Sequence, residues 1–584
     1  MLKYKSMEKI LSIKICKNCT SKFPIMEKDR EFYELMQVSS PTLCYFCRTQ
    51  RRLSYRNERF LYHRKCELTG KEIISSFSLD KPFPVYENDA WWSDEYDPVK
   101  YGRDFDFNRP FFEQFFLLRD SVPRLARQQQ KPMWNSDYCN CASQNKNCYL
   151  VFSTNRCEDC YYGSWVNDCK NCIDSKNTTR CELCYDCTNC YDCYDLKYSQ
   201  DCVNCKSSNF LRDCIGCMDC FACSNLHNKQ YHIFNQKKTK EEYENFIKNT
   251  DLGSYKTVKE GKETSQKFLQ DMIVKQYHGS NIENSLGDYL WNCKNAFTSF
   301  ECVDCEDVRY CVCIERAKSS MDHTHWGVGT ERIYDCQACG YDLFNLRFCN
   351  LCWTGCSDLT YCDQCFSSKN CFGCVGLKKN EYCILNKQYT KKEYEELIPR
   401  IIGQMKRAHG ASAQAERRSG SASLSEAELT NTNTWGEFFP SSKSCYAYNE
   451  TLAQEHKPMT KEEVLQKGWI WKDKDPKEYL PQSFQVPDNI KDVAENITNE
   501  ILGCEICGKN YKIIPQEFSF YKRQTVPIPK KCSDCRHNDR LNLRTGRILY
   551  ERKCQKCVAE IKTTYAPEAT EIVYCEDCYL DYAV

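Results

Sequence analysis

The sequence predicts a mainly β protein: a cysteine-laddered β-solenoid in two halves, with 21-residue coils and a capping helix after each half, flanked by small zinc-ribbon modules. Three observations predict this fold. Cysteines recur at a fixed step, two long cysteine arrays end in the same helix-capping pattern, and Cys-x2-Cys modules are duplicated at the two ends of the chain. At 584 residues the chain is long enough for several domains.

The cysteine step is clearest between residues 137 and 250, the first array with its capping helix. A step of 21 links Cys139, Cys160, Cys181, Cys202 and Cys223. A fixed period of about 20 residues is typical of a solenoid, in which each repeat is one coil stacked on the last. Residues one period apart are then expected about 4.8 Å from each other, on neighbouring strands.

The second array, residues 251–409, repeats the steps of 3, 9, 12 and 21 between its cysteines. Both arrays are followed by Thr and Glu in the i, i+3 relation, at Thr239 and Glu242 and at Thr390 and Glu393. This spacing is a capping box that opens a helix. Each half is therefore expected to end in a capping helix, as stacked repeats require.

The two ends of the chain are copies of one module. Residues 16–66 align without a gap on residues 504–554, with 19 of 51 positions identical. We expect an N-terminal zinc ribbon with an arginine-rich helix over 1–66 and a double ribbon over 501–584. After Cys66 the copies are expected to diverge.

Three further segments complete the organisation. Residues 67–136 are rich in aromatic side chains and are expected to cap the first coil. Residues 410–434 are rich in Ala, Ser, Gly and Thr, which favours a flexible linker. Residues 435–500 form a small segment containing tryptophan, to which no chemistry is assigned.

The paired Cys-x2-Cys turns predict zinc. Zinc prefers four tetrahedral ligands, and two such turns supply them without leaving an open position, so the ions are structural. Three sets predict at least three Zn²⁺ ions: Cys16, Cys19, Cys44 and Cys47; Cys504, Cys507, Cys532 and Cys535; and Cys554, Cys557, Cys575 and Cys578.

Zinc is also predicted between coils of the first array, where the interval between the turns equals that of the third end-module set and lies in the usual zinc range. The two sets are Cys169, Cys172, Cys190 and Cys193, and Cys181, Cys184, Cys202 and Cys205. One alternative is that these cysteines are small buried hydrophobic residues. Another is an iron–sulfur cluster, although the x3-Cys-Pro ending of the bacterial ferredoxin run is missing.

Composition bounds the other possibilities. The 47 cysteines, an odd number, stand in a chain without an apolar signal segment at residues 1–15, which favours reduced thiols in a cytoplasm over disulfides. The absence of an apolar run of about 18 residues predicts no membrane contact. The sequence also lacks HExxH, a phosphate loop and a nucleophile elbow, so we expect no enzyme. Asp322-His323-Thr-His325 is expected to be a turn rather than a metal site.

Arginines follow the second cysteine turn of each end module. Positions 48, 52, 56 and 59 step by four, four and three, so we expect these arginines on one helix face beside a zinc site, where they can meet phosphates. The predicted nucleic-acid-binding residues are Arg48, Arg52, Arg56, Arg59, Arg536, Arg540, Arg544 and Arg547. The alternative is a solvated face that pairs with acidic neighbours, since the net charge of the chain is only +1. Asn and Asp residues before cysteines, such as Asn147 and Asp168, are expected to form hydrogen-bonded ladders.

The end modules resemble bacterial zinc-ribbon (treble-clef-like) domains. The whole chain also resembles a cysteine-rich protein family of candidate-phylum bacteria, on the Cys148–Leu150 entry and the endings at residues 228–231 and 239–243. The ribbon motifs imply metal binding, and the resemblance points to no particular activity.

The functional expectation is a zinc-binding scaffold that docks on RNA or a ribonucleoprotein. The alternatives are a scaffold that binds proteins without nucleic acid, and a metal-storage or redox protein.

Overall fold

The computed structural model describes residues 8–419, 435–473, 478–482 and 484–582, with side chains left out for 407–419. The chain divides into two compact units, each built from segments distant in sequence. Unit 1 joins residues 1–127 with 277–473, so the N-terminal ribbon belongs with the second array. Unit 2 joins 128–276 with 474–584, so the C-terminal ribbons belong with the first array.

The first array forms parallel, solenoid-like sheets in unit 2, but its coil is shorter than predicted. Ser164 pairs with Lys176 and Tyr194 with Lys206, so each coil advances the chain by twelve positions. The strands are β7 (Gln129–Gln130), β8 (Asn140–Ser143), β9 (Phe152–Asn155), β10 (Ser164–Asn167), β11 (Lys176–Thr179), β12 (Tyr194–Lys197), β13 (Lys206–Asn209), β14 (Met218–Phe221), β15 (Gln230–Ile233) and β16 (Gln236–Lys237).

A triplet explains the coil length. Every third residue from Cys141 to Phe234 has a positive φ and forms a corner. Each side of the coil is therefore three residues long, and four sides make one coil of twelve residues. Asn and Asp tolerate this left-handed conformation best after glycine, which accounts for their frequency at these corners. The residue after each corner points inward, and cysteine is the commonest residue there. The cysteine steps of 3, 9, 12 and 21 are all multiples of this triplet.

The inward thiols satisfy backbone carbonyls. Cys181 Sγ lies 3.5 Å from the carbonyl oxygen of Thr179 and 3.3 Å from that of Cys190, so its S–H can donate to either. Ser175 and Ser199 occupy inward positions in the same way and donate to the carbonyls of Ile173 and Lys197. Small side chains with one donor therefore suit this narrow interior, because buried carbonyls need partners.

The second array forms one 12-stranded sheet in unit 1, whose coils are less regular, advancing the chain by 11, 12 or 13 positions. Gly279, at φ 135°, lets the first two strands approach, because a Cβ there would lie 2.0 Å from the carbonyl oxygen of Leu290. The strands are β18 (Gly279–Glu283), β19 (Leu286–Lys294), β20 (Phe297–Val303), β21 (Glu306–Arg309), β22 (Val312–Glu315), β23 (Lys318–Trp326), β24 (Glu331–Gln337), β25 (Phe344–Arg347), β26 (Ser357–Thr360), β27 (Lys369–Phe372), β28 (Glu381–Ile384) and β29 (Lys387–Gln388).

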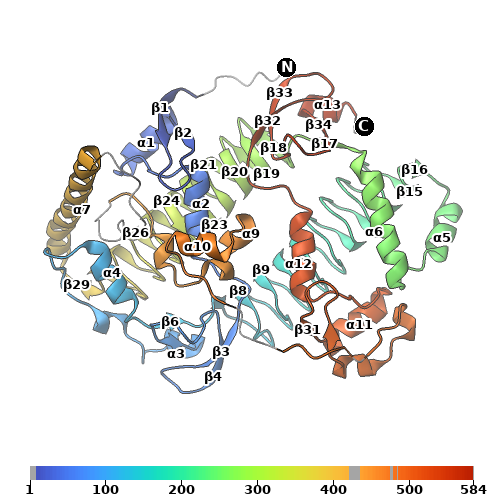
Figure 1. Ribbon diagram of the computed structural model, residues 1–584, viewed down its shortest axis with the longest axis horizontal. Coiled ribbons are helices and arrows are strands. Elements are labelled where there is room, and N and C mark those ends of the chain that lie inside the picture. Colours follow the sequence, from blue (N-terminus) through green and yellow to red (C-terminus); the bar gives the residue numbers. More distant parts are fainter. Residues whose placement is uncertain (1–7, 420–434, 474–477, 483, 583–584) are drawn as a thin grey trace. The chain divides into compact units, whose positions relative to one another are not determined.

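Helices follow both arrays, as expected. α5 (Lys240–Asn249) begins with a capping box between Thr239 and Glu242 and packs on β15, where its Tyr243 is buried (Figure 1). α7 (Lys391–Ser419) begins after the equivalent pair, Thr390 and Glu393. In unit 2, α6 (Tyr255–Gln270) follows α5 and leads to β17 (Ile273–Lys275).

Each ribbon module is a small hairpin followed by a helix that begins at a cysteine. In the N-terminal module these are β1 (Ile10–Ile15), β2 (Lys22–Met26), α1 (Glu27–Leu35) and α2 (Tyr45–Leu53). The C-terminal copy has β30 (Leu502–Gly503), β31 (Asn510–Tyr511), α11 (Pro515–Gln524) and α12 (Ser533–Asn542).

The sequence predicted that the two copies diverge after Cys66, but their folds remain the same there. The N-terminal elements are β3 (Tyr62–Lys65), β4 (Glu72–Ser75), β5 (Val85–Tyr86) and α3 (Asn88–Trp92). The C-terminal elements, at the matching positions of the duplicated module, are β32 (Tyr550–Lys553), β33 (Glu560–Thr563), β34 (Ile572–Tyr574) and α13 (Glu576–Leu580). Only the ligands differ: Cys66, Thr69, Glu87 and Ala90 stand where the C-terminal copy has Cys554, Cys557, Cys575 and Cys578.

Only the last part of the predicted aromatic cap lies on the first array: β7 and Trp134 pair with its first coil in unit 2. Residues 67–127 of the segment belong to unit 1 instead. They include η1 (Pro98–Tyr101), α4 (Phe111–Arg119) and β6 (Arg124–Leu125), and they pack beside the last coils of the second array in unit 1. The Phe111 ring centroid lies 5.3 Å from that of Tyr361 and 5.2 Å from that of Phe372, and the Trp91 centroid lies 5.4 Å from that of Phe366.

The predicted linker and tryptophan segment are organised differently from the expectation. Residues 410–419 belong to α7, and 420–434 lie outside the described residues. Residues 435–473 join unit 1 and 478–500 join unit 2. Their short helices are η2 (Ser441–Lys443), η3 (Tyr448–Glu450), α9 (Leu452–His456), α10 (Lys461–Gln466), η4 (Ile490–Asp492) and η5 (Glu495–Asn499). Among the described helices, none combines the length and apolar character needed to cross a membrane.

Candidate metal centres and arginine latches

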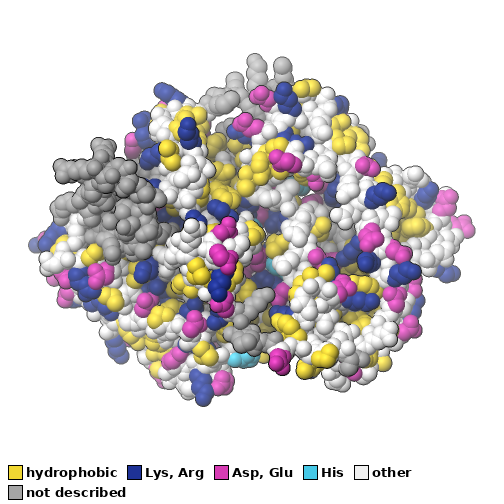
Figure 2. All heavy atoms as spheres, viewed as in Figure 1, with side chains coloured by type: hydrophobic (Ala, Val, Ile, Leu, Met, Phe, Trp, Pro, Cys, Tyr) yellow, Lys and Arg dark blue, Asp and Glu magenta, His cyan; other side chains and the backbone are white. Residues whose placement is uncertain are grey.

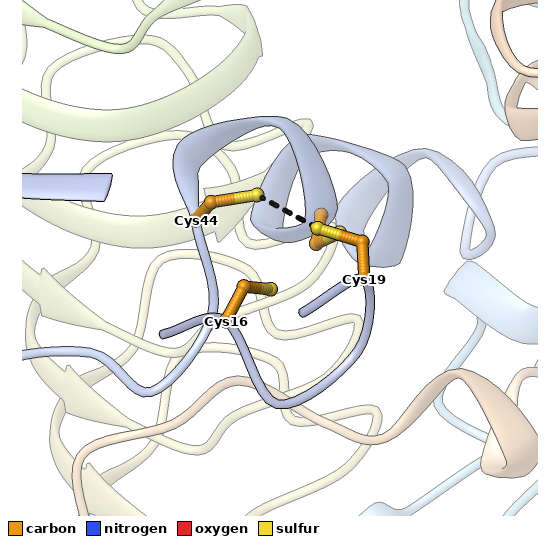
Figure 3. Close-up of side chains that lie close together, drawn as sticks. Cys16, Cys19 and Cys44 are labelled. Carbon is orange, nitrogen blue, oxygen red and sulfur yellow. Dashed lines mark hydrogen bonds between the residues drawn. The ribbon is translucent and has the colours of Figure 1, made fainter. Parts of the chain in front are cut away.

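The three end-module cysteine sets converge. In each set the four sulfur atoms all lie within 4.8 Å of one another. Cys19 Sγ and Cys44 Sγ are 3.7 Å apart (Figure 3), as are the sulfurs of Cys507 and Cys532 in the second set. A tetrahedral zinc with Zn–S bonds of about 2.3 Å requires sulfurs about 3.8 Å apart. The sets therefore fit a four-thiolate metal ion.

Backbone amides prepare these thiols for a cation. Burial acts to raise the pKa of Cys504, and the backbone N–H groups of Cys507 and Cys532 outweigh it and lower that pKa to about 6. The same balance, with the N–H groups of Cys557 and Cys575, lowers the pKa of Cys554 to about 6. Each knuckle turn thus points N–H groups at one sulfur, which favours the thiolate that a metal requires.

The solenoid sets that the sequence predicted as zinc sites do not converge. Since each coil adds twelve positions, Cys181 and Cys205 are two coils apart, about 9.6 Å, and so are Cys169 and Cys193. One zinc ion cannot bridge that distance. Within each unit taken by itself, the described solenoid residues contain no group comparable to the three end-module sets. No disulfide joins the 47 cysteines, all of which lie in the described part of the chain.

In unit 1 the metal set is joined directly to a buried ion-pair cluster. Cys44 precedes α2 and Cys47 lies in its first turn; Arg48 follows Cys47 directly, and Arg52 lies one turn further along the helix. Arg48 Nε donates to Asp322 Oδ2 at 2.8 Å. Arg52 Nη1 lies 3.2 Å from Asp322 Oδ1 and 2.8 Å from Asp335 Oδ1. Both carboxylates belong to the second array, on β23 and β24, so these pairs fasten the ribbon to the solenoid.

Burial makes this cluster energetically sensitive. Arg48 is 2% exposed, while Arg52 and Asp322 are fully buried. Burial acts to raise the pKa of Asp335, and the guanidinium groups of Arg51 and Arg52 outweigh it and lower that pKa. Removing one partner from such a cluster leaves an uncompensated charge, which costs several kcal/mol, about 3–5.

Unit 2 repeats the cluster with the C-terminal ribbon and the first array. α12 begins after Cys532, and its Arg536 and Arg540 align with Arg48 and Arg52 of the N-terminal copy. Arg536 Nε lies 2.7 Å from Asp174 Oδ2, and Arg540 lies 3.3 Å from Asp174 and 3.6 Å from Asp186. We call this arrangement of two helix arginines on two array aspartates the arginine latch.

The surroundings of the latch are duplicated as well. Arg48 stacks over Tyr310 at 5.2 Å, and Arg536 over Tyr162 at 5.0 Å. The hydroxyl of Tyr310 donates to Asp29 at 3.0 Å. That of Tyr162 pairs with Glu517 at 2.9 Å. Such agreement between two copies indicates that ribbon and array were duplicated together as a docked pair.

The structure changes the interpretation of the predicted arginine face. α2 ends at Leu53, so Arg56 and Arg59 lie after the helix rather than along it. Arg48, Arg52, Arg56, Arg536 and Arg540 are buried; Arg59, Arg544 and Arg547 are partly exposed. The latch arginines pair with acidic residues, as the alternative had it, but on a buried surface and not on a solvated helix face.

Charge on the outside of the solenoid is balanced along ladders. In unit 2, Lys146 pairs with Glu158 at 2.8 Å and Arg156 with Asp168, each one coil further on. Asn147 Nδ2 donates to Asp159 Oδ1 at 3.2 Å, which confirms a ladder role for this asparagine. Figure 2 likewise shows basic and acidic side chains interspersed on the face drawn.

The latch aspartates were missed by the sequence analysis. Asp322 is in strand β23, not in the predicted turn. A signal was available, because Tyr162, Asp174 and Asp186 follow one another at the coil step, and Tyr310, Asp322 and Asp335 do so with one extra position. The signal was missed because the predicted coil was 21 residues long, whereas these residues recur at the twelve-residue coil step.

Comparison with known proteins adds no identification. No protein-family model matches the chain, and no curated protein matches it.

Proposed function

We propose that this protein is a zinc-stapled scaffold, in which each of two solenoid halves carries a ribbon module fixed by a metal ion and an arginine latch. The observation that carries the proposal is the placement of both features on one short helix. Cys44 caps the start of α2, and the helix then carries Cys47, Arg48 and, one turn after Arg48, Arg52. Zinc would fix the direction of this helix and so aim the arginines at the array. Its role is structural, since four thiolates leave no open position.

Removal of metal tests this proposal. A strong chelator should release the ions and then undock the ribbons, because a helix as short as α2 is not stable alone. Hydrogen exchange should increase in α2 and in the strand that carries Asp322, but much less in the distant coils near Lys369. Loss of metal without any change of exchange at α2 would contradict the proposal.

Docking on RNA or a ribonucleoprotein stays a prediction. The burial of Arg48, Arg52 and Arg540 argues against their use for phosphate contacts, because exposing them would break the latch. This burial weakens the RNA prediction relative to a scaffold that binds proteins without nucleic acid. Salt-dependent affinity for RNA, measured on the whole protein, would reverse that preference.

A further inference from the structure

The N-terminal hairpin exposes an aliphatic strand. β1 pairs with β2 alone in a two-stranded sheet, so its other edge has no strand beside it in the described chain. Ile10, Ile13 and Ile15 are 55%, 64% and 65% exposed. An edge strand with exposed aliphatic side chains is a template for the addition of another chain.

The second copy of this hairpin shows what covers such a strand. In unit 2, Leu480 and Gln482 lie beside β31 and β30, respectively. Gln482 Oε1 accepts from the backbone N–H of Gly503 at 2.8 Å, and Leu480 exchanges hydrogen bonds with the Asn510 side chain at 2.8 and 2.9 Å. Phe484 packs onto the core below. Gly503 and Asn510 occupy the positions of Ile15 and Lys22 in the N-terminal copy.

Charge selects the occupant of the N-terminal copy. Lys9 and Lys22 are exposed beside the strand, and neither β1 nor β2 contains an acidic residue. The covering segment in unit 2 is flanked by Glu478 and Asp488. Two copies of β1 side by side would bring their lysines together, whereas an acidic chain would be attracted.

We propose that the exposed β1 strand is a docking site for an extended, acidic and aliphatic segment of a partner protein. The segment adds along the free edge of β1 and covers Ile13 and Ile15. In unit 2 the same place is taken by Leu480 and Gln482, whose contacts use side chains and not backbone pairing. Backbone hydrogen bonds supply affinity when a strand is added to a sheet edge, and alternate side chains supply specificity. The site does not depend on the scaffold proposal, because it needs only the hairpin.

A labelled peptide with the sequence of residues 478–488 is the probe, titrated into the full-length, metal-loaded protein. We expect saturable binding that weakens with added salt, because the lysines contribute through solvent. The variant Ile13→Ser/Ile15→Ser should bind about tenfold more weakly, since apolar area is lost. Leu79→Ser is the matched control, because Leu79 is 72% exposed elsewhere in unit 1. Metal content and melting temperature should be the same in all three proteins.

Three results would overturn the proposal. The first is equal binding by the wild type and the Ile13→Ser/Ile15→Ser variant. The second is no saturation at peptide concentrations of about 1 mM, which corresponds to a binding free energy of about −4 kcal/mol. The third is dimerisation of the wild type that this variant abolishes. The last would assign the strand to a second copy of the chain.

Discussion

Replacement of Asp322 by asparagine is expected to destabilise unit 1 by about 3 kcal/mol, near the lower end of the range for a broken buried ion pair. The carboxylate is fully buried and accepts from Arg48 at 2.8 Å and from Arg52 at 3.2 Å. Asparagine keeps the shape and one acceptor but removes the charge. Arg52 retains Asp335, whereas Arg48 is left without a carboxylate partner, which sets the size of the effect.

The assay is urea unfolding followed by the tryptophan fluorescence of unit 1, with hydrogen exchange at α2 to locate the change. Glu113→Gln is the control, because the Arg109–Glu113 pair is 44% and 48% exposed and water screens such pairs, so they contribute little to stability. The triple variant Asp322→Leu/Arg48→Met/Arg52→Met should recover part of the loss, since apolar groups can replace a buried ion pair at little cost. If Asp322→Asn were as mild as Glu113→Gln, the latch would not hold the ribbon.

Three further perturbations have definite outcomes. Burial lowers the pKa of His323 to about 4, against about 6.5 in the unfolded chain, so the unfolded state binds a proton first as the pH falls. The free energy of unfolding should therefore drop by about 3 kcal/mol between pH 6.5 and pH 4. Urea midpoints should fall less in His323→Gln over this range, and parallel curves for the two proteins would contradict the assignment. Cys181→Ser should leave the metal content unchanged and lower the free energy of unfolding by less than about 2 kcal/mol, because serine already fills equivalent inward positions. Loss of a metal ion in this variant would instead indicate a metal site in the solenoid. Gly279→Ala should lower the free energy of unfolding, measured by thermal melting, by about 2–4 kcal/mol, because its Cβ would meet the Leu290 carbonyl. Gly403→Ala is the control: it has open space around it and should be neutral or stabilising.

The end modules were the most predictable part of the protein. Cys-x2-Cys turns bring two sulfurs together by local geometry alone, so the sets containing Cys16 and Cys504 could be paired from spacing. The capping boxes at Thr239 and Thr390 are local as well, and both helices begin there. Gap-free duplication indicated two copies, though it did not show that the N-terminal copy keeps its fold after losing the ligands around Cys66.

The coil length and the latch were not predictable in the same way. The 21-residue cysteine step occurs because inward positions recur every three residues and 21 is a multiple of three. The stacking distance is set instead by the coil length, which is twelve residues because four three-residue sides close one coil. The solenoid zinc sets failed for this reason. The latch joins Arg48 to Asp322, which are 274 residues apart in sequence, so no local pattern connects them. Burial also reverses the meaning of these arginines, from phosphate-binding groups to internal clamps.

The metal content of the intact protein tests the central claim most directly. Protein purified without added metal, weighed by native mass spectrometry and assayed for elements, should carry three zinc ions per chain. Cys44→Ser and Cys532→Ser should each remove one ion and increase hydrogen exchange in the helix that bears Arg48 or Arg536, respectively. A count far below three, or iron in place of zinc together with the brown colour of an iron–sulfur protein, would contradict the account.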